Sequence, residues 1–427
     1  MRTTFRHAVV QVLRSVQAGW MILGVTLIML LLVESCARVQ RARSGVDTPR
    51  NPVASGEPQA TFDWFPGYTR EYDATRPQVW RSFVYWGRRP GFKGQYVNVD
   101  SAGRRVTPQP LAPATPAARV FFFGGSTMWG TSQRDGHTIP AEAARRLQAI
   151  AGPGQRIEVT NLAENGYVMT QEILVLMRQL QAGNRPDVVV FYDGINDVGT
   201  TVQNGVAALP QNEAKRVAEF AMGRVIDRSG FERGLRKDMR AWKALAGAGI
   251  KQFALYDWAQ SKKAPPAESY IGADSAARLT ARMYGENARM IEALGTAYGF
   301  VPIFVWQPSL SSTTKQLTPY EQRTMQSIER SPYWRRQKET HQVIAPYLDS
   351  AMATVAPERF VNAIGLFKGD TMAVFTDRIG HNTEASIPRI VDSFWPVLEA
   401  AIQRQRAAAQ RARPGTVAVT PVPQRTN

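Results

Sequence analysis

The stretch that decides the fold is Val120-Phe121-Phe122-Phe123-Gly124-Gly125-Ser126-Thr127. A short, uninterrupted apolar run that ends at glycines is typical of a strand buried in a parallel sheet. The two glycines allow a sharp turn where the strand ends, and open α/β sheets bind their ligands at that edge. The stretch therefore predicts a parallel sheet with Ser126 at a crevice, either as an exposed nucleophile or as the N-cap of a following helix.

Three more segments are expected at the same edge of the sheet. Residues 161–166 and 192–197 each follow a strand-like run, and residues 377–381 precede a final amphipathic helix. Acyl transfer needs a hydroxyl nucleophile, an imidazole base, a carboxylate that orients the base, and donors for the oxyanion. The candidates for these roles are Ser126 as nucleophile, His381 as base, Asp377 as orienting acid, and an oxyanion hole made by the N–H groups of Ser126 and Gly166 with the side-chain amide of Asn196.

The four blocks, with serine, glycine, asparagine and histidine in that order, resemble those of the SGNH hydrolase superfamily, also called GDSL-like. The resemblance covers roughly residues 118–398, and Gly194-Ile195-Asn196-Asp197 is its most specific block. It implies a serine esterase or acyl hydrolase, and more narrowly a membrane-anchored member of the type found in polysaccharide gene clusters. The first block differs from the commoner Gly-Asp-Ser, because Gly-Gly-Ser-Thr stands in its place.

The spacing of the acid also differs from the family pattern, in which the aspartate usually lies three residues before the histidine. Asp377 lies four residues before His381, so Asp377 is the favoured acid, with Asp370 and Glu384 as alternatives. Gly380 could absorb the extra residue, because glycine tolerates backbone angles that other residues avoid. A Ser–His pair supported by a backbone carbonyl would also suffice, as in some related families.

Only four histidines are available as the base. His7 precedes an apolar segment, His341 falls in a polar helical stretch where a solvated face is expected, and His137 is expected in a loop or at a helix start. His381 stands just before the predicted final helix, residues 384–403, which would return it to the nucleophile. It is therefore the predicted base.

Other catalytic motifs are incomplete. Gly125 to Gly130 begin like a phosphate-binding loop, but Thr131 stands where that loop needs its lysine. No Gly-x-Ser-x-Gly elbow surrounds Ser126, which argues against the α/β-hydrolase fold proper. The chain has one cysteine and no His-Glu-x-x-His motif, so no metal and no other cofactor is expected.

Length and charge limit the partners. A chain of 427 residues that is 44% hydrophobic can bury a large core. The net charge is +17, and much of it is terminal, since residues 401–427 hold five arginines and no acid. A moderately basic body suits an anionic polymer, and no motif indicates nucleic-acid binding. The expected partner is an acylated carbohydrate polymer, and the oligomeric state is left open.

The N-terminus predicts a membrane or export signal. Residues 18–33 form a 16-residue stretch without a charge, after a segment that contains Arg2, Arg6 and Arg14. A span needs about 20 residues, so this stretch is short for an anchor. The alternative is a lipoprotein signal ending at Cys36, but Glu34 is atypical in a lipidation box, so an uncleaved anchor is favoured. An anchor would make this a single-pass protein of the inner (cytoplasmic) membrane, with its catalytic domain facing the periplasm or exterior.

The whole chain is expected to be α/β, with a three-layer, doubly wound, mostly parallel sheet of the SGNH or flavodoxin-like kind. Aromatic residues between 62 and 105 are expected to pack an extension against this core rather than to stack on sugars. The predicted parts are an anchor or signal (1–36), a flexible linker (37–61), the N-terminal extension (62–115), the catalytic domain (116–403) with a helical insertion at about 200–270, and a disordered basic tail (404–427).

The predicted function is that of a serine-dependent acyl-ester hydrolase that removes or transfers O-acetyl groups on an extracytoplasmic polysaccharide. Three alternatives stay open. A polysaccharide O-acyltransferase would use the same residues, a lipid esterase would act on another ester, and a polysaccharide-binding assembly component would have kept the fold without catalysis.

Overall fold

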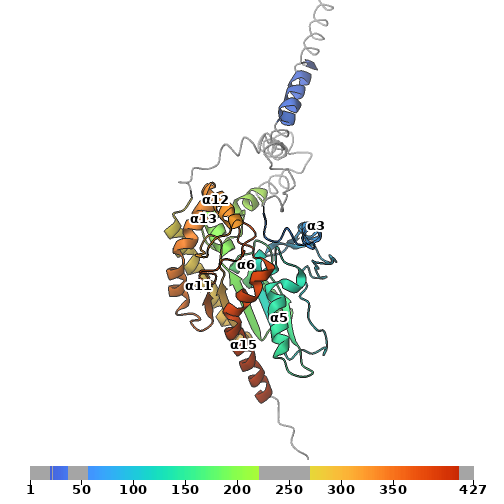
Figure 1. Cartoon of the computed structure of the whole chain (residues 1–427), viewed down its shortest axis with the longest axis vertical. Coiled ribbons are helices and arrows are strands. Elements are labelled where there is room, and N and C mark those ends of the chain that lie inside the picture. The colour runs from blue at the N-terminus through green and yellow to red at the C-terminus, as the bar shows by residue number, and fades with distance from the viewer. Residues whose placement is uncertain (1–19, 22, 37–55, 221–269, 413–427) are drawn as a thin grey trace, which may run out of the picture. The chain divides into compact units, whose positions relative to one another are not determined.

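The computed structural model describes residues 20–21, 23–36, 56–220 and 270–412 (Figure 1). The chain divides into two compact units. The larger unit, residues 52–213 and 267–427, contains the sheet and every candidate site residue. Most of the predicted linker and of the predicted helical insertion lies outside the described residues.

A five-stranded sheet forms the centre of the larger unit, and all its pairings are parallel. Its strand order is β4-β3-β5-β6-β7, so β3, which comes first in the chain among the strands of this sheet, lies between the second, β4, and the third, β5. This is the doubly wound order of flavodoxin-like folds, whose ligand crevice opens where connections leave in opposite directions, beside the first strand. The strands are β3 (Ala118–Gly124), β4 (Ile157–Asn161), β5 (Val188–Asp193), β6 (Val301–Trp306) and β7 (Phe360–Asn362).

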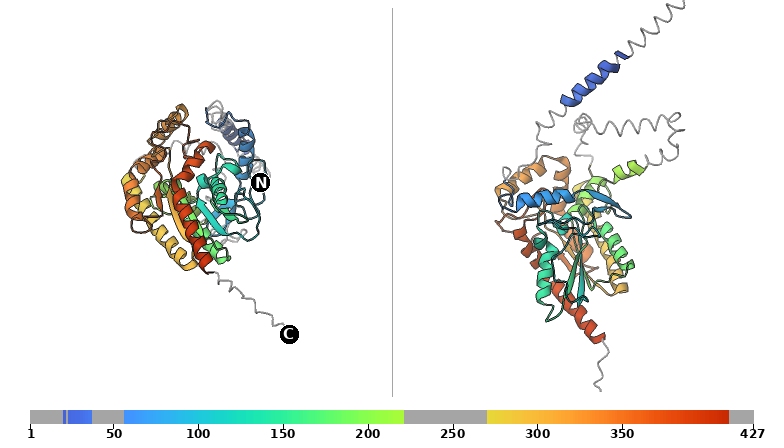
Figure 2. Two further views of the ribbon diagram at one scale, coloured as in Figure 1. Left: turned by 60° about the horizontal axis from the view of Figure 1, so that its bottom comes forward. Right: turned by 90° about the vertical axis from the view of Figure 1, so that its right-hand side faces the viewer.

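Alternate residues of the strands fill two separate cores, because successive strand side chains point to opposite faces. On β3, Val120 and Phe122 belong to one core, and Phe121 and Phe123 to the other. Helices cover both faces, which confirms the parallel sheet with flanking helices (Figure 2). The first core includes residues of α5 (Ile139–Ala149) and α15 (Ile387–Ala412), and the second includes residues of α6 (Met169–Gln181), α7 (Ile195–Asn204), α11 (Ala273–Tyr298) and α14 (Ala345–Met352).

Two helices lie between β6 and α14 in the chain, α12 (Pro319–Glu329) and α13 (Pro332–Val343). The helix α12 begins with a capping box, since Thr318 and Glu321 each accept a hydrogen bond from the other's backbone N–H. Glu321 also forms a fully buried ion pair with Lys315 at 2.6 Å. These contacts fix the start of α12.

The N-terminal extension belongs to the larger unit and packs against the rest of it with most of its aromatic residues. It consists of α3 (Phe65–Thr75) and an antiparallel hairpin, β1 (Gln78–Arg81) and β2 (Tyr85–Arg88). Phe65, Tyr68 and Trp86 are buried, as the packing interpretation predicts. Trp80 and Phe83, in contrast, are about two-thirds exposed, at 70% and 68%.

The prediction of a single-pass inner-membrane protein is wrong. In the described part of the chain, no helix has both the length and the apolar character needed to cross a bilayer. The uncharged run that suggested an anchor has only 16 residues, whereas a helical span needs about 20.

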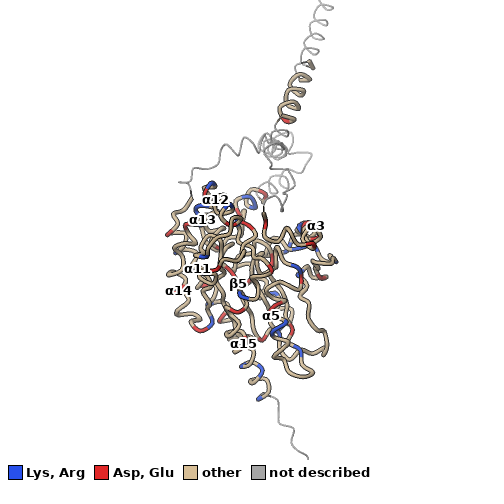
Figure 3. Tube along the Cα trace, viewed as in Figure 1, with Lys and Arg blue, Asp and Glu red and all other residues tan. Residues whose placement is uncertain are grey.

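The C-terminal tail differs from its prediction over residues 404–412, which continue α15 as helix to Ala412. Ala407, Ala408 and Ala409 have the highest intrinsic helix propensity. Arg406 fixes this end of the helix by donating to the carbonyl oxygen of Ile150 at 2.9 Å. Arginines are spaced along these last turns of the helix (Figure 3).

Candidate active site

The structure brings Ser126, His381 and Asp377 into one chain of hydrogen bonds. His381 Nε2 lies 2.7 Å from Ser126 Oγ, and His381 Nδ1 lies 2.6 Å from Asp377 Oδ2. A carboxylate can only accept, so Nδ1 carries the hydrogen and the Nε2 lone pair faces the serine hydroxyl. Ser126 and His381 are buried, at 8% and 5% exposed. In this geometry the imidazole can take the hydroxyl proton as the oxygen attacks.

A tight turn holds Asp377 despite the unusual spacing. Asp377 Oδ1 accepts hydrogen bonds from the backbone N–H groups of Ile379, Gly380 and His381, at 2.9 to 3.3 Å. Gly380 has a φ of +93°, in the left-handed region that favours glycine, and a Cβ there would lie 2.9 Å from Ile195 Cδ1. The glycine therefore accommodates the extra residue and leaves Oδ2 free to bind the imidazole.

The pKa of Asp377 reflects these contacts. Burial alone would raise it, but the charge of His381 and hydrogen bonds from His381 and Gly380 outweigh burial and hold the pKa below its usual value. The carboxyl group therefore stays ionised throughout the neutral range and can stabilise an imidazolium.

Neither of the alternative acids is placed to orient His381. Glu384 accepts hydrogen bonds from Arg134, with 2.7 Å between Arg134 Nη2 and Oε2. Asp370 forms an ion pair with Arg389. Both carboxylates are thus engaged by arginines, and Asp377 is the acid in contact with the imidazole.

Ser126 is the first residue of the short helix α4 (Ser126–Trp129), directly after β3 and Gly125. A Cβ on Gly125 would lie 2.1 Å from Asn196 Nδ2, so only glycine allows this approach. Asn196 is near the start of α7, which follows β5. The adjacent strands β3 and β5 thereby bring the serine loop and the asparagine loop into contact at the carboxyl edge of the sheet.

The third loop joins them through Tyr167. Asn196 Nδ2 donates one hydrogen to the Tyr167 carbonyl oxygen at 2.8 Å, which leaves the second amide hydrogen available. Gly166, next to Tyr167, has a φ of +79°. Among the described residues, neither the Ser126 N–H nor the Gly166 N–H donates to a backbone carbonyl in a turn, loop or cap. The predicted donors thus belong to loops that touch one another.

The N-terminal extension holds the loop that contains Gly166. The sequence analysis did not predict this role of the extension. Trp86 Nε1 donates to the Asn165 carbonyl oxygen at 2.8 Å, and the Arg88 N–H donates to Glu164 Oε2 at 2.7 Å. Tyr167 Oη donates to the Trp86 carbonyl oxygen at 2.5 Å. Trp86 and Arg88, both on β2, therefore hold the residues on either side of Gly166.

The extension also fixes α4 through two buried arginines. The guanidinium carbons of Arg88 and Arg105 lie 4.5 and 4.4 Å from the Trp129 ring centroid, within cation–π range. Arg105 is held in turn by Asp135, at 2.7 Å, and Arg88 by Glu164, at 3.3 Å. The helix that begins with Ser126 is thus braced by residues that precede β3 in the chain.

Three buried carboxyl groups lie around the asparagine loop. The sequence analysis did not predict this cluster either. Glu172, Asp193 and Asp197 are 0%, 2% and 8% exposed. Burial raises the pKa of Glu172 well above its usual range, and the charges of Asp193 and Asp197 raise it further. Burial raises the pKa of Asp197 to about 6, although hydrogen bonds from the N–H groups of Met169 and Gly194 oppose the shift. The cluster therefore retains protons that exposed acids would release.

One of these carboxyl groups, that of Asp197, helps to position the loop. Asp197 Oδ1 accepts from the Met169 N–H at 3.2 Å and so joins the start of α6 to the start of α7. Both oxygens of Glu172 lack a donor from the rest of the described chain, and a proton shared with Asp193 would satisfy one of them. Across the described ranges, no group of three or more His, Cys, Asp or Glu is arranged to hold a metal ion.

The remaining histidines lie elsewhere. His137 ends a short 3-10 helix, two residues before α5 begins, and is half-exposed. The prediction of a solvated His341 is wrong, because the side chain is 4% exposed and burial lowers its pKa to about 4. Its helix, α13, packs against α7 and α11 and turns Gln337, Thr340 and His341 inward. His7 lies outside the described residues.

Comparison with known proteins adds little to this geometry. No known protein-family profile and no curated protein matches the chain. Among solved structures, it is similar to LAE5, an alpha/beta hydrolase enzyme from the metagenome of Lake Arreo, Spain, with 12% identity, coverage of 68% of this chain and 96% of that one, and a TM-score of 0.33. TesA matches at 13% identity, over 66% and 99% of the two chains, with a TM-score of 0.32.

The acetyl xylan esterase AlAXEase matches at 12% identity, over 66% of this chain and 99% of its own, with a TM-score of 0.31. TM-scores this low carry no argument about activity. The functional conclusion therefore rests on the contacts among Ser126, His381 and Asp377.

Proposed function

We propose that the chain is a serine-dependent acyl-ester hydrolase of the SGNH type. The observation that carries this proposal is the pair of short hydrogen bonds that joins Ser126 to His381 and His381 to Asp377, at 2.7 and 2.6 Å. This chain of hydrogen bonds joins a nucleophile, a base and an orienting acid, which is the arrangement that activates a serine hydroxyl.

The proposed reaction has two steps. Ser126 Oγ attacks the ester carbonyl carbon while His381 Nε2 takes the hydroxyl proton, and Asp377 stabilises the imidazolium. His381 then protonates the departing alcohol, which leaves an acyl group on Ser126. A water molecule then attacks the acyl group while His381 takes one of its protons, and His381 passes that proton to Ser126 Oγ as the acid is released.

The negative charge on the carbonyl oxygen needs donors in both steps. The N–H groups of Ser126 and Gly166 and the free hydrogen of the Asn196 amide are proposed to supply them. Contact between the loops supports this assignment, since Asn196 lies against Gly125 and bonds to Tyr167. Fixed donors of this kind stabilise the developing charge without having to reorganise.

We further propose that the ester is an O-acetyl group on a carbohydrate polymer. The segment Asn98-Val99-Asp100-Ser101-Ala102-Gly103 supports this substrate, because it resembles the turn that precedes the catalytic domain in SGNH proteins from polysaccharide gene clusters. The same residues would serve an acyltransferase, and the fate of the acyl group distinguishes the two reactions.

A fluorophosphonate reagent tests the nucleophile directly. It is expected to label the folded protein at one serine, which peptide mass spectrometry would place at Ser126, and to abolish release of acetate from a chromogenic acetyl ester in parallel. Equal labelling of the heat-unfolded chain, or labelling at another serine, would contradict the proposal.

Asn196→Ala is expected to lower the turnover number by roughly a hundred- to a thousandfold, as the loss of one oxyanion donor usually does. KM should change little, because the donor acts mainly in the transition state. Steady-state kinetics with the chromogenic ester measure both quantities. Asn204→Ala, at the other end of the same helix, is the matched control and should retain activity. A rise in KM alone would make Asn196 a ground-state contact.

A further inference from the structure

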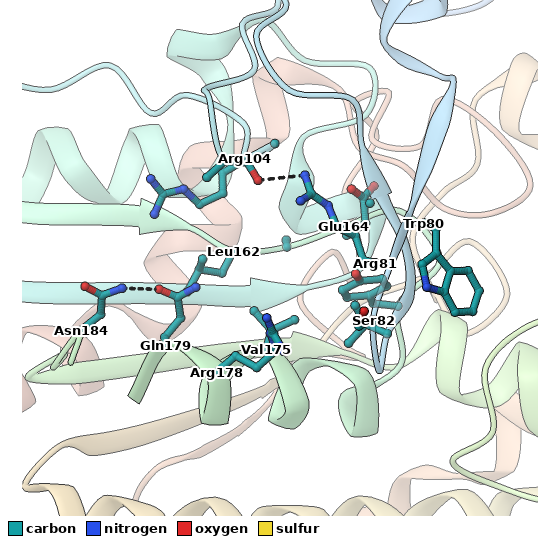
Figure 4. Close-up of a pocket in the computed structure, with 16 residues that line it drawn as sticks. Trp80, Arg81, Ser82, Arg104, Leu162, Glu164, Val175, Arg178, Gln179 and Asn184 are labelled. Carbon is teal, nitrogen blue, oxygen red and sulfur yellow. Dashed lines mark hydrogen bonds between the residues drawn. The ribbon is translucent and has the colours of Figure 1, made fainter. Parts of the chain in front are cut away.

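A cavity of about 610 Å³ lies next to the loop that contains Gly166. Its walls come from the β1–β2 hairpin, the turn at residues 102–104, the end of β4 and one face of α6 (Figure 4). Val175, Arg178 and Gln179 line it from α6, and their i, i+3, i+4 spacing places them on the same side of that helix. The volume is within the usual range for small-ligand sites.

The side chains that line this cavity carry a net positive charge. Three arginines line it, Arg81, Arg104 and Arg178, and Glu164 is the only acid among the lining residues. Arg104 is paired with Asp100 at 2.8 Å, and Glu164 with Arg88 at 3.3 Å. Two guanidinium groups, those of Arg81 and Arg178, therefore remain without a carboxylate within ion-pair distance in the described part of the chain.

Arg81 is held in place by backbone contacts. Its Nη2 donates to the carbonyl oxygens of Ala102, at 3.1 Å, and of Arg88, at 3.4 Å. A Cβ on Gly103 would lie 2.6 Å from Arg81 Nη2, so the side chain occupies space that only glycine leaves open. An ordered guanidinium group loses little side-chain entropy when an anion binds.

Arg178 approaches from the other wall. It is exposed, and its guanidinium carbon lies 5.5 Å from the ring centroid of Phe83, at the turn of the hairpin. Guanidinium groups match the planar geometry of a carboxylate and bind it through paired N–H groups. The two arginines thus favour an anionic ligand that enters between the hairpin and α6.

The other lining groups suit a sugar. Asn184 Nδ2 donates to Gln179 Oε1 at 2.8 Å, which leaves the amino group of Gln179 and the carbonyl oxygen of Asn184 for hydroxyl groups. Ser82 adds a hydroxyl, and Trp80, 70% exposed, offers an aromatic face at the rim. Polar groups beside an exposed aromatic ring suit a ring that is apolar on one face and bears hydroxyls at its edge.

The cavity and the candidate active site share one loop. Glu164 and Tyr167 line the cavity, and Gly166 lies between them in the chain. A chain that filled the cavity would therefore pass beside the residue proposed as an oxyanion donor.

We propose that this cavity binds a carboxylate-bearing sugar residue of the acylated polymer, with its carboxylate between Arg81 and Arg178. This inference rests on the proposed function for the position of the ester. The ligand it names is a glycan that contains uronic acid residues.

Isothermal titration calorimetry of the Ser126→Ala variant with an unacylated hexuronic acid oligosaccharide tests the proposal without any catalysis. Binding is expected, and it should weaken at least tenfold when Arg178→Gln or Arg81→Gln is added, and as salt is raised. Arg404→Gln, on the exposed side of α15, is the matched control and should leave binding unchanged. A neutral oligosaccharide of the same length should bind at least tenfold more weakly.

A kinetic comparison separates the cavity from the reacting groups. Arg178→Gln should leave kcat/KM for a small neutral acetyl ester within twofold of wild type and lower kcat/KM at least tenfold for an acetylated hexuronic acid oligosaccharide. Arg81 is held by the carbonyl oxygens of Ala102 and Arg88, so replacement of Arg178 removes none of these contacts.

Hexuronate binding that does not depend on either arginine would overturn the proposal, and so would equal binding of the neutral oligosaccharide. Inorganic phosphate that binds more tightly than the oligosaccharide, with the same dependence on Arg81 and Arg178, would identify a phosphate site instead. Calorimetry needs no nucleophile, so failure of Ser126 labelling would refute the hydrolase function without changing these binding results.

Discussion

Ser126→Ala is expected to reduce turnover of an acetyl ester to less than a few per cent of wild type while the protein stays folded. The substitution removes the oxygen that lies 2.7 Å from His381 Nε2, and without it no acyl-enzyme can form. The side chain is small and 8% exposed, so its loss creates almost no cavity. The free energy of unfolding should change by about 1 kcal/mol or less, the usual net contribution of one hydrogen bond.

The measurement pairs steady-state turnover with thermal unfolding of the same preparation. Ser101→Ala, in an exposed turn of the extension, is the matched control and should behave like wild type in both. A folded Ser126→Ala variant with substantial esterase activity would exclude Ser126 as the nucleophile. Loss of activity together with loss of the folded state would be a stability effect, which the unfolding curve reveals.

The sheet could be predicted because its signals are local. The apolar run Val120–Phe123 and the matching run Val188–Phe191 pair with each other in parallel, with Phe122 opposite Val190. Since parallel strands end at the same edge, the segments that follow them were expected to meet, and Gly125 does contact Asn196. The left-handed φ of Gly380 is likewise a local property that glycine indicates.

The bracing of the site could not be predicted, because its partners are far apart in the chain. Trp86 and Asn165 are separated by 79 residues, and Arg88 and Glu164 by 76. No periodicity in the sequence connects an arginine in a hairpin with a glutamate after β4. Aromatic residues interleaved with arginines indicate that the extension packs against the core, but they do not indicate which loop or helix it contacts.

Buried polar clusters escape sequence reasoning for a related reason. Glu172 stands on an amphipathic helix among residues that could equally face solvent, and only the sheet places it beside Asp193. His341 lies in a polar stretch of α13, but one side of α13 packs against α7 and α11, and there the polar side chains of Gln337, Thr340 and His341 are buried. On a helix that is polar all round, the sequence does not show which side is buried.

His381→Ala is expected to lower turnover nearly as much as Ser126→Ala, and Asp377→Asn clearly but less. The effects of substitutions within a catalytic triad do not add, because its members act together, and the orienting acid is usually the least essential of the three. In the structure, His381 is the only base in contact with Ser126 among the described residues, whereas Asp377 acts through His381. The two substitutions therefore separate the proton acceptor from the group that positions it.

Stability against pH checks that Asp377 acts as a charged group. Its folded pKa is lowered, so it contributes stability that is fully present above its unfolded pKa, about 3.9, and is lost as the pH falls through the lower folded value. The difference in free energy of unfolding between wild type and Asp377→Asn should therefore be constant near neutrality and shrink in strong acid. Asp370→Asn, whose partner is Arg389, is the control and should leave turnover near wild type. An active His381→Ala variant, or an Asp377→Asn variant with wild-type turnover, would refute the assignment of base or acid respectively.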